Sequence, residues 1–513
     1  MRTVALKSTA GRWVMASAVL TSSMAFIDGT ALNVVLPSLQ QSLRASGSDL
    51  FWILNAYLVM LASLMLIGGS LGDRLGHKKV FMYGIVAFII GSTACGLSGD
   101  AASLILFRLL QGAGGALMIP GSLSLISSSI NSSERGKAIG TWSSFTTLVT
   151  MGGPVLGGAM ADAGLWRFIF FINVPIGIAA LLILWRHVQE PLRSPEKKPL
   201  DILGAMTICT SLAAITYGVL SSSAQGHGHL VAISFLLIGF VLLFLFILIE
   251  HLNDNPMMPL KLFASAAFAG ANLLTFFLYA SLGSGMLFLS LNLVQIQGYS
   301  QLQSGLAFLP FTLLILFFAG FAGKLADQYG SKIFLTCGPL TAGLGLLILS
   351  LQGQTSGPAE YWTTFFPGIL VFGLGMAFTV APLTSSVMGS VNEEYSGIAS
   401  GINNAITRIA NVFAYAILGA LAVFIFSGRL SEAVQHIPIS ATEKVEVLRQ
   451  AGNLGNAKVP VFIHLPTSKL VTQAYHASFI RAFMLIIRLS ALLAFIGSFF
   501  AFFMIKSKRY KYR

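Results

Sequence analysis

Residues 69–79 read GSLGDRLGHKK, and residues 323–333 read GKLADQYGSKI. The same residue type recurs at five matched places in the two segments, namely Gly69/Gly323, Leu71/Leu325, Asp73/Asp327, Gly76/Gly330 and Lys78/Lys332. Apolar segments that begin at residues 13 and 267 are separated by the same number of residues as these two copies. A repeat on this scale predicts a chain built from two duplicated units, each containing one copy of the loop.

The composition around this repeat is that of an integral membrane protein. Of the 513 residues, 55% are hydrophobic and only 10% are charged, and the mean hydropathy is +0.80. Soluble domains carry about 25% charged residues, and disordered chains are poor in apolar residues. The three cysteines each lie inside an apolar run, so we expect neither a disulfide framework nor a metal cluster.

Apolar runs long enough to cross a bilayer as a helix, which takes about 20 residues, recur along the whole chain. We place fourteen of them at 13–36, 51–70, 80–98, 102–126, 138–160, 166–186, 202–221, 230–250, 267–291, 304–324, 332–351, 363–387, 402–426 and 479–505. The runs are continuously apolar, whereas the strands of a transmembrane barrel alternate. The sequence therefore predicts an all-α polytopic membrane protein, with the first run retained as a helix rather than removed as a signal peptide.

The repeat and the spans together predict three parts. Residues 1–190 form an N-terminal six-helix half, residues 191–260 contribute two inserted helices with flanking loops, and residues 261–513 form a C-terminal six-helix half. Within the last part, residues 427–478 form an extracytoplasmic segment, with an amphipathic piece at 443–450 that we expect on the outer surface.

Lysine and arginine decide the orientation of the chain. Most of the 31 Lys and Arg residues fall on the side of the N-terminus, and the segment 427–478 follows this rule least. Both termini are therefore expected in the cytoplasm. The net charge of +13 reflects this topology and contact with anionic lipid, so no nucleic-acid partner is expected.

Several motifs along the chain resemble those of the major facilitator superfamily, and the fourteen spans resemble its drug:proton antiporters with two additional central helices. The resemblance rests on the two loop copies and on IDGTALNVVLP (27–37), RLLQGAGGA (108–116), GPVLGG (153–158) and WRFIFFINVPIG (166–177). It implies a major facilitator fold and export driven by the proton gradient, with no cofactor and no catalytic or metal site. It also implies a multi-pass protein of the bacterial cytoplasmic membrane.

Asp28 is the candidate proton carrier. Of the eighteen acidic residues, it alone lies well inside a predicted span. A charge at mid-membrane costs about 2.5–3.5 kcal/mol on insertion scales, so such a residue usually faces a cavity or a partner. Arg108 is the natural counter-charge, because both residues fall at a similar depth, roughly 12 and 9 Å below the outer surface. The resemblance implies proton transfer for Arg108. The alternatives are a structural, protonated Asp28 and an Arg108 that extends to the headgroups.

The two loop copies are expected to act as a gate. Gly69, Gly76 and, in the second copy, Gly330 are expected to let the neighbouring helices approach closely. The resemblance implies that charged contacts of Asp73, Arg74 and Lys78, matched by Asp327 in the second copy, close the cytoplasmic side in the outward-facing state. The alternative is a solvated turn that carries positive-inside charges.

The span 138–160 is expected to seal the interface between the halves. Pro154 removes a backbone hydrogen bond, while Gly153, Gly157 and Gly158 leave one face free of side chains. Three further residues, Arg488, Asn411 and Tyr415, are candidates for lining a cavity.

These features predict a proton-coupled antiporter that exports hydrophobic or cationic amphipathic compounds by alternating access, as in multidrug efflux. Its partners are then small amphipathic substrates, protons and the lipid bilayer, and a periplasmic adaptor is left open. The alternatives are a dedicated exporter of a lipid, siderophore or metabolite and, less favoured, an uptake symporter or a membrane sensor without coupling.

Overall fold

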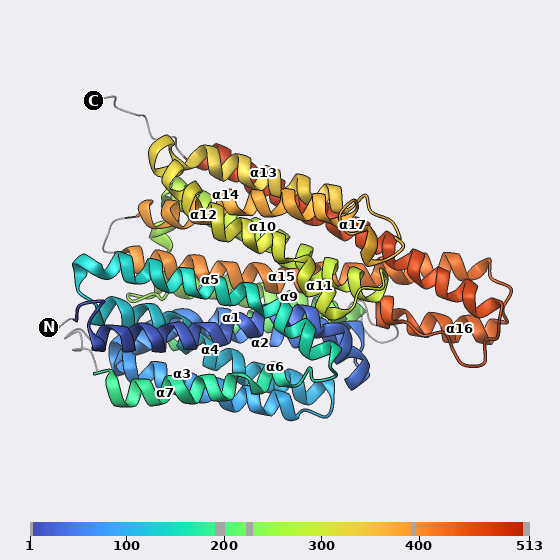
Figure 1. Ribbon diagram of the computed structural model, residues 1–513, viewed down its shortest axis with the longest axis horizontal. Helices are drawn as coiled ribbons and strands as arrows, with labels where there is room; N and C mark the ends of the chain where they lie inside the picture. Colours follow the sequence, from blue (N-terminus) through green and yellow to red (C-terminus); the bar gives the residue numbers. More distant parts are fainter. Residues whose placement is uncertain (1–3, 190–200, 222–228, 392–394, 506–513) are drawn as a thin grey trace.

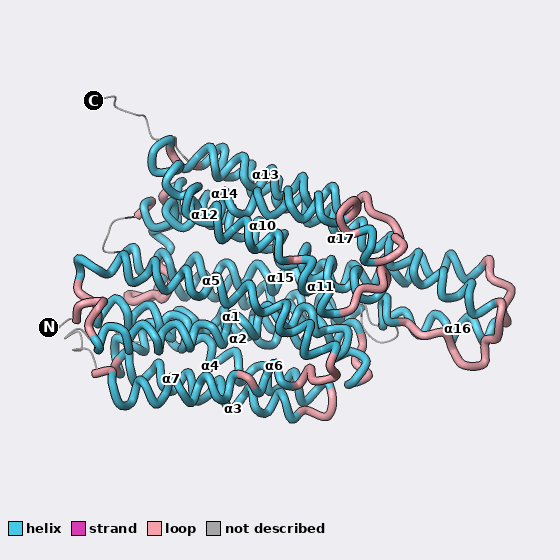
Figure 2. The backbone as a smooth tube through the Cα atoms, in the orientation of Figure 1, coloured by secondary structure: helices cyan, strands magenta, loops and turns pink. Residues whose placement is uncertain are grey.

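The computed structural model describes residues 4–189, 201–221, 229–391 and 395–505. Within these ranges it leaves out the side chains of some residues in the segments 66–74, 132–151 and 396–397 and at position 327. Within these ranges helices and connecting loops make up the chain, and the one β-type pairing is an isolated bridge between Val4 and Ile130 (Figure 2). The predicted all-α fold is therefore confirmed.

Long helices account for most of the described chain (Figure 1). They are α1 (Thr9–Leu43), α2 (Gly47–Leu75), α3 (His77–Leu97), α4 (Ala101–Ser129), α5 (Ser132–Asp162), α7 (Asn173–His187), α8 (Ile202–Ser221), α9 (His229–Leu252), α10 (Ala266–Gln295), α12 (Leu309–Tyr329), α13 (Ser331–Leu349), α14 (Phe365–Gly389), α15 (Ser396–Gln435) and α17 (Thr467–Met504). Shorter pieces are α6 (Phe168–Phe171), η1 (Leu260–Ala264), α11 (Gln301–Ala307), η2 (Pro358–Glu360), α16 (Ala441–Arg449) and η4 (Gln450–Asn456).

Thirteen helices in the described residues are long and apolar enough to cross a membrane. Two of these spans include a short leading helix, because α6 continues into α7 and α11 into α12. The remaining predicted span, 138–160, lies in α5, which has 31 residues and packs between α1 and α11. A helix with protein on two sides presents less surface to lipid, so it tolerates a lower hydropathy.

The helices form two bundles that lie side by side (Figure 1). Helices α1–α7 pack together in one, and α10 to α14 and α17 pack in the other, with α15 between the bundles against α2, α10 and α17. Helices α8 and α9 pack on each other and contact the bundles through α8, which touches α2 and α15. The division into halves at residues 190 and 261 stays a prediction, and residues 190–200 lie outside the described part.

Both termini lie at one end of the molecule, and at the opposite end α15 and α17 project beyond the bundles (Figure 1). The predicted segment 427–478 is thus not a separate piece, since α15 continues to Gln435 and α17 already begins at Thr467. The expected amphipathic helix is present as α16. It is held through Tyr475, whose hydroxyl donates to the carbonyl of Val447 at 3.2 Å.

Polar contacts join the two bundles at the end opposite the termini. Gln40 of α1 accepts hydrogen bonds from Gln295 of α10 at 3.2 Å and from Asn456 of η4 at 2.7 Å. The Asp162 carboxylate at the end of α5 accepts the backbone N–H groups of Gln301 and Leu302, at 2.8 and 2.9 Å. These hydrogen bonds hold the two bundles together at this end.

Candidate functional site

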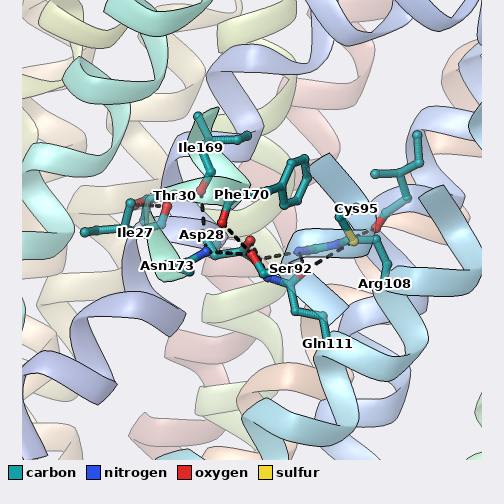
Figure 3. A network of polar contacts seen from close by, with 12 residues as sticks. Ile27, Asp28, Thr30, Ser92, Cys95, Arg108, Gln111, Ile169, Phe170 and Asn173 are labelled. Atoms are coloured by element: carbon teal, nitrogen blue, oxygen red, sulfur yellow. Dashed lines mark hydrogen bonds and ion pairs between the residues drawn. The ribbon is translucent and has the colours of Figure 1, made fainter. Parts of the chain in front are cut away.

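The centre of the first bundle contains a buried ion pair between α1 and α4 (Figure 3). Nη1 of Arg108 lies 2.5 Å from Oδ2 of Asp28, and the two side chains are 1% and 0% exposed. The predicted pairing of these two residues therefore exists. A single unpaired charge buried here would strongly destabilise the folded protein. Each of the two residues can therefore be buried because the other neutralises its charge.

Gln111 completes this pair. Its side-chain oxygen accepts from Nη1 of Arg108 at 2.7 Å, and its Nε2 donates to Oδ1 of Asp28 at 2.9 Å. Arg108 and Gln111 are three residues apart on α4, so both reach the same face of the helix. The carboxylate thus has a donor on each oxygen, which stabilises its ionised form.

A second layer of hydrogen bonds holds Gln111 in place (Figure 3). Its Nε2 also lies 3.3 Å from the Ser92 hydroxyl of α3, which accepts from Nδ2 of Asn173 at 3.0 Å and donates to the Phe170 carbonyl at 2.8 Å. The network therefore connects α1, α3, α4, α6 and α7 through buried polar groups.

Arg108 is further fixed from the α2 side. Its Nε donates to the Ile53 carbonyl at 3.2 Å, and its guanidinium lies 4.3 Å from the centre of the Tyr57 ring. The arginine therefore has contacts with α2 and with Gln111 of its own helix that do not depend on the charge of Asp28. Protonation of Asp28 would remove the charge partner and leave these contacts, so the site can respond to a proton without losing its arginine.

Sequence reasoning missed Gln111, Ser92, Asn173 and Tyr57. Gln111 and Asn173 are inside segments already singled out, RLLQGAGGA and WRFIFFINVPIG. The spacing of Gln111 from Arg108 was the usable signal, because two polar residues three apart in an apolar helix share a face. Ser92 and Tyr57 carry no comparable signal, since single serines and tyrosines are common in membrane helices.

The glycines of α5 contact two different neighbours. A methyl group at Gly157 would lie 2.8 Å from the Ala31 carbonyl oxygen of α1, and one at Gly153 would clash with the Thr30 side chain. On another face, a methyl group at Gly158 would clash with the Gln301 carbonyl of α11. Gly305 of α11 contacts the carbonyl of Pro154 in the same way. Backbone contact of this closeness places α5 between the bundles.

The two loop copies have matching backbone geometry. Gly76 joins α2 to α3 with φ 106° and ψ 130°, and Gly330 joins α12 to α13 with φ 89° and ψ 143°. Lys78 donates to the Val188 carbonyl at 2.6 Å. Gly69, Asp73 and Arg74 fall in α2 and Asp327 in α12, but their side chains lie outside the described residues, so their contacts stay a prediction.

The cavity candidates fall in two places. Asn411 and Tyr415 of α15 pack against Gly283 of α10, and the Tyr415 hydroxyl lies against Asn33 of α1, at the contact between the bundles. Arg488 is instead an exposed residue of α17, and its Nε lies 3.4 Å from the Ser350 hydroxyl at the end of α13. The structure does not bring Arg488 to the other candidates, because that face of α17 points out of the bundle.

Arg408 lies closer to the centre than Arg488. It is half-buried on α15 and within electrostatic range of Tyr57, Tyr279 and Tyr415, on three different helices. Its Nε is buried without a hydrogen-bond partner, and among the described residues no carboxylate pairs with it. Within the described part of the chain, the contact between the bundles therefore carries a positive charge without a carboxylate partner.

The sequence profile of the Major Facilitator Superfamily matches residues 18–415 and 273–510, which together span most of the chain. The chain belongs to this superfamily. It is a multi-pass membrane transporter rather than an enzyme, and its fold is that of the superfamily.

Characterised relatives of this transporter are named as resistance and export proteins. The tetracenomycin C resistance and export protein of Streptomyces glaucescens is 29% identical over 94% of this chain and 90% of its own length. The multidrug resistance protein Stp of Mycobacterium tuberculosis (strain CDC 1551 / Oshkosh) is 29% identical over 84% and 80%. The methylenomycin A resistance protein of Bacillus subtilis (strain 168) is 30% identical over 81% and 88%. These relatives confirm the resemblance to the fourteen-helix drug exporters.

Solved structures support the fold. A bacterial homologue of the human lysosomal transporter Spinster, in an inward-facing and unoccupied conformation, superposes with a TM-score of 0.66 at 17% identity, covering 98% of this chain and all of that one. A D-xylose–proton symporter superposes with a TM-score of 0.58 at 14% identity, covering 97% and 98%. At these identities the likeness concerns the fold alone.

Proposed function

We propose that this transporter exports hydrophobic and amphipathic compounds, antibiotics among them, across the bacterial cytoplasmic membrane in exchange for protons. The observation that carries the proposal is the buried Asp28–Arg108 pair with Gln111 on the second carboxylate oxygen. A carboxyl group in this position is the part that proton coupling requires, because its charge can be removed by one proton.

The cycle begins when a proton reaches Asp28 from the outside. Protonation removes the negative charge from the pair, so Arg108 retains only its contacts to Gln111, Ile53 and Tyr57. The helices that share the network, α1, α3 and α4, then exchange one set of contacts for another, and the bundles rock about the central contact. Release of the proton to the cytoplasm restores the pair. The membrane potential adds about 2.3 kcal/mol per charge per 100 mV.

The termini are proposed to lie in the cytoplasm, which makes the opposite end the outer side. The hydrogen bonds of Gln40 and Asp162 between the bundles then close the outside. Such a state faces inward, as does the Spinster homologue with which the chain superposes. The close contact of α5 with α1 and α11 supports its proposed role as a seal between the halves.

Arg408 bears on the charge of the substrate. Asp28 is already neutralised by Arg108, whereas Arg408 carries a charge with no carboxylate partner in the described chain. This arrangement favours neutral or acidic compounds over the cationic ones predicted from Asp28 as the one acidic residue inside a span. Because two relatives are named for single antibiotics, a dedicated exporter of one compound is the second candidate.

The test is substrate-driven proton movement in inside-out vesicles, energised and then offered neutral, acidic and cationic amphiphiles. Loss of the pH gradient on addition of substrate is expected with the natural chain and with Asp254→Asn, an exposed acidic residue that serves as control. Asp28→Asn should insert normally and give no response. Full proton-coupled transport by Asp28→Asn would refute the scheme, and a response to a single compound class would select the dedicated exporter.

A further inference from the structure

A pair of buried carboxyl groups, separate from Asp28, lies in the inserted helices. Asp201 immediately precedes α8, and Glu250 is near the end of α9. Asp201 is 7% and Glu250 2% exposed. Most of α9 faces outward, with only 17% of its apolar span buried, so the burial of Glu250 is a local feature.

In each carboxyl group, one oxygen accepts a hydrogen bond from a backbone N–H group, and the other oxygen has no donor. Oδ1 of Asp201 accepts from the Gly204 N–H at 2.8 Å, and Oε2 of Glu250 accepts from the Met258 N–H at 2.9 Å. Oδ2 of Asp201 and Oε1 of Glu250 are buried with no donor. The two side chains nevertheless lie within hydrogen-bonding contact of each other. Two carboxylate oxygens, both hydrogen-bond acceptors, therefore lie together without a hydrogen atom to bond them.

No cation among the described residues supplies that donor. His251, Asp254 and Lys261, the titratable groups that follow Glu250 along α9, the next loop and η1, are exposed, and Lys261 donates to the Tyr395 hydroxyl at 3.0 Å. On α2, which packs against α8, the Asp73 and Arg74 side chains lie outside the described part. Two ionised carboxylates in contact repel each other, and a shared proton converts that repulsion into a hydrogen bond.

We propose that Asp201 and Glu250 form a proton-binding site, separate from the Asp28–Arg108 pair, in which one proton is held between Oδ2 of Asp201 and Oε1 of Glu250. The bound proton joins the start of α8 to the end of α9. Through the Met258 N–H it also fixes the loop that leads into η1 and α10. Loss of the proton separates α8 from α9 at this end and releases that loop. The inserted helices thereby respond to pH where α8 begins and α9 ends.

Infrared difference spectroscopy of the purified full chain tests the proposal without measuring transport. The background is Asp28→Asn, which removes the remaining buried carboxyl group among the described residues. We expect the C=O stretching band of a protonated acid, titrating with pH, in this background and also when Asp254→Asn is added as a matched control. Adding Glu250→Gln or Asp201→Asn should abolish the band, because the new amide donates the missing hydrogen bond and the remaining acid ionises.

Thermal unfolding in detergent provides a second readout. A proton bound only in the folded state stabilises it below the pH at which the proton leaves, so the midpoint temperature should fall as pH rises. Glu250→Gln should flatten this fall, and Asp254→Asn should not. A band that survives Glu250→Gln would overturn the proposal. Binding of calcium or manganese that Glu250→Gln abolishes would also overturn it, since the occupant would then be a metal ion.

Discussion

The carboxamide of Gln111 donates to Oδ1 of Asp28, the carboxylate oxygen that Arg108 does not bind. One residue therefore contacts both members of the central ion pair and connects them to Ser92. This arrangement makes Gln111 a positioning residue for the proposed proton carrier, although it carries no charge itself.

Gln111→Leu should slow proton-coupled export by about tenfold or more. A hydrogen bond to a charged group contributes about 1.5–3 kcal/mol, and a factor of ten in rate corresponds to about 1.4 kcal/mol. The leucine leaves one oxygen of Asp28 without a donor. Initial rates of substrate-driven proton movement measure the loss. Unchanged rates would show that Gln111 does not position Asp28 for transport.

Gly158→Ala should shift the transporter away from the state described here. The added methyl group meets the Gln301 carbonyl, and overpacking of this kind costs about 1–3 kcal/mol. That energy corresponds to a roughly 5–150-fold change in the balance of two states. Spin labels at the exposed positions Leu165 and Trp362, in a chain without its native cysteines, would report a longer distance between the bundles.

Gly152→Ala is the matched control for Gly158→Ala. It lies on the same helix, and its added methyl group has only the Leu156 side chain nearby, at 4.0 Å. If both substitutions move the label distance equally, α5 does not act through its contact with α11.

Gln40→Leu should favour opening of the end opposite the termini. It removes the acceptor of Gln295 and Asn456 and the donor to the Asn453 carbonyl, which hold α1, α10 and η4 together. Three neutral hydrogen bonds contribute about 0.5–1.5 kcal/mol each. The same Leu165–Trp362 label pair should show a larger population at long distance. A population equal to that of the natural chain would assign the closure to apolar packing.

Gly76→Ala and Gly330→Ala should each lower stability by about 1–2 kcal/mol, because left-handed backbone is costly for residues with a Cβ atom. Both glycines have positive φ, at 106° and 89°, so the two penalties should be similar. Thermal unfolding in detergent measures them, with Gly99→Ala as control, since a Cβ there has open space. A loss at only one of the two sites would argue against equivalent roles for the loop copies.

The repeat was the most informative feature of the sequence, and Gly76 and Gly330 explain why. A turn that needs positive φ between two helices selects glycine in both copies, so local geometry leaves a pattern that can be read without a structure. Helix extents were less predictable. The continuation of α15 to Gln435 and the early start of α17 depend on packing beyond the membrane, where hydropathy carries no signal.

By itself, the sequence determined the membrane class, the all-helical fold, the repeat and the pairing of Asp28 with Arg108, because hydropathy, helix length and charge at depth are properties of single segments. Only the tertiary structure identified Gln111, Ser92 and Asn173 as partners of that pair, placed Arg488 outside the bundle and brought Asp201 to Glu250. These relationships join residues on different helices, and a contact between helices depends on how they rotate and cross, which no single segment encodes.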